Sequence, residues 1–377
     1  MSVLLPKDTI DAAIGAYAIE GPGSDAEQKF SIYENLTDKF SFSKNGRFES
    51  VTGAFLLKSK SGFGVIARGK GRFSGDVLIA LRGTASALDW LTDGNTGIQL
   101  SGTGKIVHAG FNRVFKEFEP DLRRYFSANT PARVHCVGHS LGGALAGLTA
   151  DWLSHNNIAQ PYLYTFGSPR IGFKPFADRL TQQVGKENIF RVHHNNDVVS
   201  LVPVWPFVHV PQPGMSCCLQ NHGYNMISAH YKENYSKSVK NITEWGEIKI
   251  PAVEESSDLE IKNWLSMDTV NVLSTATLNM IGSAIRLILK ASGIAAQLIA
   301  IGGITVLDQL SYALDRAIQT SKDVATLVGL LMKKILSMIG KTISATANIT
   351  IEFIRWVLNL LMTAVNGMVN MALSVLD

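Results

Sequence analysis

Residues 134–150 read VHCVGHSLGGALAGLTA, where an apolar run meets a glycine-rich turn and small residues then continue at helical spacing. The apolar run predicts a buried strand, and the small residues after Ser140 predict a helix. Gly138, Ser140 and Gly142 fit the G-x-S-x-G pattern, in which a serine lies on a sharp turn between a strand and a helix. Glycines are expected beside it because a side chain there would collide within so tight a turn. The alternative is a glycine-rich connection with an incidental serine.

Strand-like and helix-like patterns alternate on both sides of this stretch. Such alternation predicts an α/β fold with a mostly parallel central sheet that helices cover on both faces. The predicted strands are 52–58, 63–69, 77–82, 133–137, 162–166 and 189–193, and the predicted helices are 112–127, 141–154 and 176–184.

A serine is a weak nucleophile, so the turn calls for a base and for an acid that orients the base. Asp197 lies in a loop just after the predicted strand 189–193, where an α/β-hydrolase places this acid, although an aspartate here can also cap its own turn. Three histidines follow. His209 lies in an apolar run that is typical of a packed side chain, whereas His222 and His230 both stay open as the base.

Hydrolysis through a serine also needs donors for the negative charge on the carbonyl oxygen. The backbone N–H of Leu141, the residue after the serine, is one such donor. Thr84 follows the predicted strand 77–82 and offers both a backbone N–H and a hydroxyl, unless this is only the turn that ends a strand.

Six segments in this order resemble the class 3 lipase family, the fungal triacylglycerol lipase-like branch of the α/β-hydrolases, over roughly residues 50–240. They are LRGTASALDWLTD (81–93), VHAGF (107–111), GHSLGGALA (138–146), TFGSPRIG (165–172), NDVVSLVP (196–203) and SAHYKENY (228–235).

The resemblance implies ester hydrolysis on lipids, often at an interface, with no cofactor and no obligatory metal. It implies that Ser140 is the nucleophile, Asp197 the orienting acid and His230 the base, and that Thr84 and Leu141 form the oxyanion hole. A serine more usually follows the histidine of the last segment, and here a tyrosine does, so His222 remains the second candidate for the base.

The segment after the oxyanion strand forms a lid in that family. Here it carries Leu88, Trp90 and Leu91 among polar residues, so it can hide an apolar face in water and turn it to lipid. The alternative is that the segment only anchors a loop to the sheet.

The composition changes along the 377 residues. We expect an α/β-hydrolase lipase domain over 1–250, a polar linker over 251–268, and a helical, apolar domain over 269–377. Amphipathic patterns over 324–339 and 356–376 fit two arrangements of this last region: a helical bundle docked on the lipase domain, or helices that lie on or insert into a bilayer. Membrane contact is slightly favoured, since the neighbouring domain handles lipid.

Net charge, cysteine content and the N-terminal residues limit the possible partners and location of the protein. A net charge of +4 is small for this length and argues against a nucleic-acid partner. The three cysteines are expected to be reduced, no metal-binding spacing is present, and the N-terminus does not resemble a cleaved secretory signal. These features predict synthesis in the cytoplasm and, for a target outside the cell, secretion by another route.

An apolar helical region behind such a lipase resembles antibacterial lipase effectors of type VI secretion. This resemblance implies phospholipid substrates in a target membrane, and an immunity protein or a secretion adaptor as partner. The rival hypothesis is a membrane-disrupting or pore-forming protein that acts through its C-terminal helices.

Overall fold

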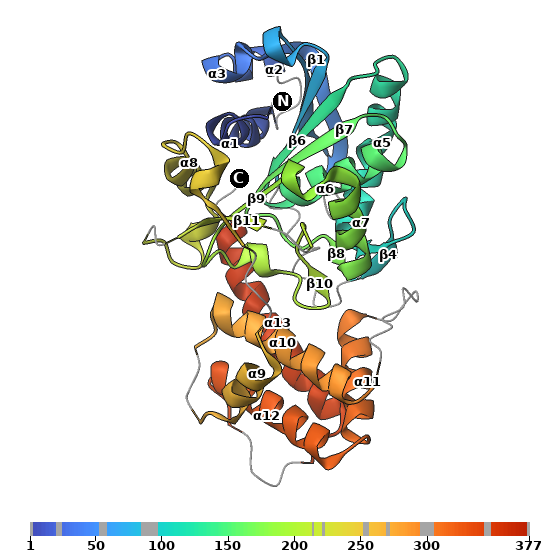
Figure 1. Ribbon diagram of the computed structural model, residues 1–377, viewed down its shortest axis with the longest axis vertical. Helices are drawn as coiled ribbons and strands as arrows, with labels where there is room; N and C mark the ends of the chain where they lie inside the picture. Colours follow the sequence, from blue (N-terminus) through green and yellow to red (C-terminus); the bar gives the residue numbers. More distant parts are fainter. Residues whose placement is uncertain are drawn as a thin grey trace.

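The computed structural model describes residues 3–19, 25–52, 59–83, 97–212, 215–220, 223–251, 256–268, 272–294, 305–342 and 348–374 (Figure 1). Most of the predicted strand 52–58 lies outside these ranges.

An eight-stranded sheet forms the centre of the α/β part, with the strand order β1-β2-β3-β6-β7-β9-β11-β12. The five consecutive strands β3, β6, β7, β9 and β11 run parallel to one another, while β1 and β2 at one edge and β12 at the other edge pair antiparallel. Their bounds are β1 Phe40–Thr52, β2 Ser59–Gly69, β3 Asp76–Leu81, β6 Arg133–His139, β7 Gln160–Phe166, β9 Ile189–His194, β11 Met215–Leu219 and β12 Lys249–Pro251.

A second, four-stranded antiparallel sheet has the order β10-β8-β5-β4. Its strands are β4 Ile98–Leu100, β5 Ile106–His108, β8 Gly172–Phe173 and β10 Phe207–Val208.

Helices cover both faces of the central sheet (Figure 1). Along β3, Ile79 and Leu81 point into the core under one set of helices, while Leu78 and Ala80 point into the core under the other. A strand that is buried on both faces must be apolar at every position, which explains the continuous apolar runs in the sequence. One face carries α5 Ala109–Ser127, α6 Leu141–His155 and α7 Lys174–Val184; the other carries α1 Pro6–Gly15 and α8 Lys232–Val239.

Short elements complete this part of the chain. They are α2 Ala26–Phe30, α3 Glu34–Thr37, and the 3-10 turns η1 Ala16–Ile19, η2 Gly71–Phe73, η4 Lys186–Asn188, η5 Val199–Leu201, η6 Ser228–His230 and η7 Trp245–Glu247. The predicted α/β fold with a mostly parallel sheet is confirmed.

The C-terminal region is a bundle of helices at one end of the α/β part (Figure 1), which confirms the predicted all-helical character. A serine or threonine caps all five of these helices by accepting a backbone N–H in the first turn, and so marks each start locally: Ser257, Ser274, Thr305, Ser321 and Thr350. The helices are α9 Asp258–Ser266, α10 Thr275–Ala291, α11 Val306–Ile318, α12 Lys322–Met338 and α13 Ile351–Leu373.

The predicted polar linker 251–268 is structured for much of its length. Lys249–Pro251 is strand β12, and α9 packs on α10 and α12 through Ile261 and Leu265, each 2% exposed. These two apolar side chains lie four positions apart on one face of α9, which gives an otherwise polar segment a buried side.

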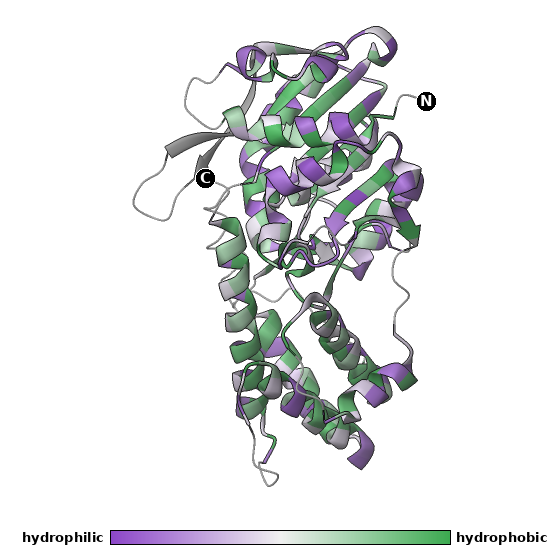
Figure 2. Cartoon of the chain, turned by 90° about the vertical axis from the view of Figure 1, so that its left-hand side faces the viewer, coloured by the Kyte–Doolittle hydropathy of each residue, from purple (hydrophilic) through white to green (hydrophobic). Residues whose placement is uncertain are grey.

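Helix α13 is long and apolar enough to cross a membrane by length and composition, with a mean hydropathy of 1.4 over its most apolar window. Half of that window is buried within the protein. Figure 2 shows that hydrophobic residues make up much of the bundle helices. In this arrangement the bundle is docked on the α/β part, and its apolar stripes pack inward.

Candidate active site

The turn between β6 and α6 holds Ser140 in an unusual backbone conformation. Its φ is 58° and its ψ is −132°, a region that a serine rarely adopts. A Cβ on Gly138 would lie 2.1 Å from the carbonyl oxygen of Gly142, and a Cβ on Gly142 would lie 2.2 Å from that of Leu81. Only glycine fits at these two positions, so the turn is as tight as the sequence pattern predicts.

The structure brings Ser140, His230 and Asp197 into one hydrogen-bonded row. The Nε2 atom of His230 lies 2.9 Å from the Oγ atom of Ser140, and its Nδ1 atom lies 2.9 Å from Oδ2 of Asp197. The serine follows β6, the aspartate follows β9, and the histidine ends η6. Since β6, β7 and β9 are adjacent parallel strands, their carboxyl ends deliver the first two side chains to one edge of the sheet.

Asp197 is held by donors on both oxygens. Besides His230, the hydroxyl of Tyr235 donates to Oδ2 at 2.7 Å, and the backbone N–H of Val199 donates to Oδ1 at 2.8 Å. Burial raises the pKa of this carboxyl, but the nearby His230 and the hydrogen bonds outweigh burial and leave the pKa below its ordinary value. Asp197 is therefore an anion near neutral pH and favours a proton on Nδ1 of His230.

A further chain of hydrogen bonds supports the backbone of His230. The Nε2 atom of His139 lies 2.9 Å from the carbonyl oxygen of His230, and its Nδ1 atom lies 2.8 Å from the hydroxyl of Tyr17. Burial, followed by the proximity of His230, keeps the pKa of His139 well below its ordinary value, so this ring is neutral. Because a carbonyl only accepts, Nε2 of His139 carries the proton and Nδ1 accepts from Tyr17.

The predicted oxyanion donors are described in part. Leu141 is the first residue of α6, so its N–H has no acceptor within the helix and adjoins Ser140. Thr84 lies outside the described residues, whereas its neighbour Gly83 approaches the serine closely. A Cβ on Gly83 would lie 3.1 Å from Cβ of Ser140 and 2.6 Å from the hydroxyl of Tyr17. The loop after β3 therefore reaches the nucleophile.

Four other predictions fall on residues that the structure does not describe. They are the second candidate for the base, His222, and the lid residues Leu88, Trp90 and Leu91. Of the two histidines left open by the sequence, His230 is the one that contacts Ser140 in the described part of the chain.

Sequence reasoning missed three residues that contact this row or the His139 ring that supports it. Tyr235 and Tyr17 are described above, and Gly167 is the third. Its φ is +55°, and a Cβ there would lie 2.7 Å from Oδ2 of Asp197. Gly167 and Tyr235 belong to segments already singled out in the sequence, but Tyr17, 122 residues before His139, carries no such signal.

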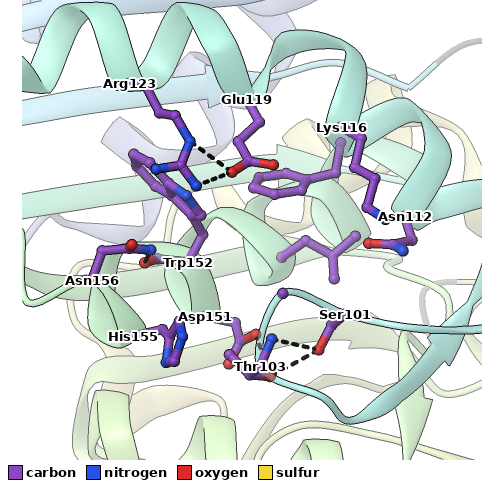
Figure 3. Close-up of a pocket in the computed structure, with 13 residues that line it drawn as sticks. Ser101, Thr103, Asn112, Lys116, Glu119, Arg123, Asp151, Trp152, His155 and Asn156 are labelled. Carbon is purple, nitrogen blue, oxygen red and sulfur yellow. Dashed lines mark hydrogen bonds and ion pairs between the residues drawn. The ribbon is translucent and has the colours of Figure 1, made fainter.

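A separate cavity of about 160 Å³ lies between α5, α6 and the loop after β4 (Figure 3). The ion pair of Arg123 with Glu119 and the hydrogen bond of Thr103 to Asp151 lie at its wall. Ser140, Asp197 and His230 are not among its lining residues, so it is distinct from the row above. Within the described ranges, no group of three or more His, Cys, Asp or Glu side chains is placed to hold a metal ion.

The strand order and the serine turn define an α/β-hydrolase. Residues 78–207 match the family model described as lipase (class 3), so this α/β part is similar to the class 3 lipase family.

Among curated relatives, the secreted mono- and diacylglycerol lipase 1 of Fusarium solani is 35% identical over 137 residues, which cover 34% of this chain and 39% of that protein. The toxin TseL of Vibrio cholerae is 33% identical over 107 residues, which cover 27% of this chain and 16% of the toxin. The chain thus matches less than half the length of either relative. A solved structure of a mutant form of MDLA from Penicillium cyclopium has a TM-score of 0.45 at 24% identity, covering 57% of this chain and 79% of that one.

Proposed function

We propose that this protein is a serine hydrolase that cleaves carboxylic ester bonds of lipids. The observation that carries the proposal is the continuous row from Ser140 through His230 to Asp197, with both hydrogen bonds of the histidine at 2.9 Å. The match to the class 3 lipase family model supports a lipid as the source of the ester bond.

In the first half of the reaction, Oγ of Ser140 attacks the ester carbonyl carbon while Nε2 of His230 takes the hydroxyl proton. Asp197 accepts from Nδ1 of His230 and stabilises the resulting imidazolium. The carbonyl oxygen becomes an anion, which the N–H of Leu141 and the positive end of α6 stabilise, with Thr84 proposed as the second donor. The anion then collapses, the C–O bond breaks, and the imidazolium protonates the departing alcohol.

The second half releases the acyl group from Ser140. Water attacks the acyl-serine ester, and Nε2 of His230 takes a proton from that water. A second oxyanion forms at the same donors and collapses with cleavage of the bond to Oγ, which regains its proton from the histidine. The products are a free fatty acid and the unmodified enzyme.

Ser140→Ala tests the proposal, with free fatty acid released from defined phospholipid and triacylglycerol as the measurement. The variant should lose turnover by about 10⁴-fold or more while keeping its fold, because the nucleophile is absent. Unchanged fatty-acid release would reject the proposal. Leakage of vesicle contents by a folded Ser140→Ala variant, with no lipid cleaved by either form, would instead favour the pore-forming alternative.

We further propose that the substrate is phospholipid in the membrane of a target cell, which the protein reaches by secretion, and that an immunity or adaptor protein is its partner. Similarity to the toxin TseL and the apolar bundle support this finer assignment. Expression in the periplasm of a bacterial host should arrest growth and release lysolipid, whereas the Ser140→Ala form at equal abundance should do neither. Growth arrest by both forms would contradict it.

A further inference from the structure

In this structure the proposed catalytic row is closed to lipid. Ser140 is 1% exposed, and His230 and Asp197 are fully buried. The carbonyl carbon of a lipid ester must approach Oγ to about 3–3.5 Å before bond formation, which this arrangement does not allow. Some part of the protein that lies against the row must therefore move before substrate binds.

Two helices of the C-terminal bundle lie against the loops that carry the row (Figure 1). Helix α10 contacts η5, which begins two residues after Asp197, and α13 contacts η6, which ends at His230. Both helices belong to the region that lies beyond the class 3 lipase match.

The contact between α10 and the α/β part is close and mainly apolar. Val199 and Leu201 of η5 belong to the same buried cluster as Leu278 and Ile281 of α10. Gly282 lies directly on Trp205, because a Cβ added to this glycine would be 3.2 Å from Cβ of the tryptophan. Asn279 accepts a hydrogen bond from the Arg170 guanidinium at 3.1 Å.

Helix α13 presents an apolar side inward and a mainly polar side, which includes Glu352 and Arg355, to solvent. Val365, Val369 and Ala372 are fully buried, whereas Asn359 and Asn370 are exposed. If α10 and α13 moved away, these apolar faces would meet water, which is unfavourable over so large an area. Opening therefore needs another apolar surface to receive them.

We propose that α10 and α13 form an internal cap on the loops of Asp197 and His230, and that a lipid bilayer opens this cap by receiving the apolar faces of the two helices. The 23 residues and mean hydropathy of α13 suit it to contact with hydrocarbon. The inference rests on the proposed function, since the bilayer would supply both the opening force and the substrate.

Two glycine positions provide a matched test. Gly282→Leu forces a side chain against Trp205 and should weaken the cap, whereas Gly367→Leu adds the same side chain on α13 where a Cβ meets open space. Each replacement raises helix propensity equally. The measurement is the rate at which a water-soluble phosphonate ester labels Ser140, with and without phospholipid vesicles.

Vesicles should speed labelling of the wild-type protein about tenfold or more, because the rate follows the fraction of open molecules. Without vesicles, Gly282→Leu should label about tenfold faster than wild type, and Gly367→Leu should match wild type. Equal rates for all three proteins, with no effect of vesicles, would overturn the cap.

If Gly282→Leu does not fold, a reversible cross-link provides a second test. In the double variant Trp205→Cys, Gly282→Cys, the two Cβ atoms would lie 3.2 Å apart, slightly closer than the distance of about 3.5–4.5 Å across a disulfide. The three native cysteines are buried and compete poorly. Oxidation should abolish the acceleration by vesicles, and reduction should restore it.

Oxidised protein that still responds to vesicles would overturn the cap, as would a reduced double variant that labels no faster with them. A different result would reject the proposed function itself: a folded wild-type protein that neither reacts with the phosphonate nor cleaves any ester, with or without vesicles. The two proposals therefore fail in distinguishable ways.

Discussion

Replacing Asp197 with asparagine keeps the shape of the side chain but reverses one of its hydrogen-bonding roles. The backbone N–H of Val199 donates to Oδ1, so the amide oxygen of the asparagine should take that position and its NH₂ group the position of Oδ2. The NH₂ group would then take the nearer of the two positions to Nδ1 of His230, which lies 2.9 Å from Oδ2 and 3.1 Å from Oδ1 in the native row.

The consequence reaches the serine through the tautomer of His230. Two donors cannot face one another, so Nδ1 becomes an acceptor and the proton moves to Nε2, which then donates to Oγ of Ser140 and cannot take its proton. A wrong tautomer of this kind lowers kcat about 10⁴-fold, or about 5.5 kcal/mol of transition-state stabilisation. The reverse amide orientation would place two donors together at Val199, at a cost of about 1–3 kcal/mol.

The assay is kcat on a short, soluble ester for folded Asp197→Asn protein, with folding checked by circular dichroism. Tyr235→Phe keeps the carboxylate and removes one donor, so it should lose far less activity. Asp151→Asn changes a buried aspartate at the separate cavity and should leave kcat unchanged. Asp197→Asn protein that retains more than about a hundredth of wild-type kcat would refute the tautomer argument.

Two further predictions concern the buried histidines. His139→Leu removes the donor to the His230 carbonyl, so it should lower kcat, with little change in KM, and lower the free energy of unfolding by about 1–3 kcal/mol. His139→Gln keeps an N–H donor and should recover much of both losses. Equal losses in the two variants would contradict the role of that N–H. Burial lowers the pKa of His135 and of His139 below the unfolded value of 6.5, so the unfolded chain binds more protons than the folded one below that pH. The free energy of unfolding should therefore keep its full value above about pH 6.5 and decrease below that pH by up to about 1.4 kcal/mol per pH unit for each histidine. A free energy of unfolding that stays constant in urea titrations from pH 8 to 5 would contradict this.

Much of the α/β fold could be predicted because its signals are local. The pattern around Ser140 requires glycine at positions 138 and 142, and the structure shows the backbone contacts that impose this. Strands buried on both faces appear as continuous apolar runs, and the bundle helices begin at serine or threonine caps. Each of these features depends on residues a few positions apart.

Of the proposed active site, mainly the three catalytic residues Ser140, Asp197 and His230 could be predicted from the sequence. The order of serine, aspartate and histidine along the chain follows from α/β-hydrolase chemistry, but the choice between His222 and His230 depends on where the chain after β11 returns to the sheet. Tyr17 joins the site from the N-terminal segment across 122 residues. No pattern in the sequence records such a contact, because it arises from the packing of η1 beside the end of β6.

The turn at Ser140, the strand and helix periodicities, and an apolar helical region poor in titratable groups all follow from residue order alone. That α10 and α13 lie against the loops of Asp197 and His230, rather than apart from them, becomes visible only in the folded chain. An apolar stripe requires a cover, but its residues do not specify which surface provides it. The same faces of α13 fit a protein core or a lipid surface, and the complementary shape of Trp205 against Gly282 is formed only once both segments have folded.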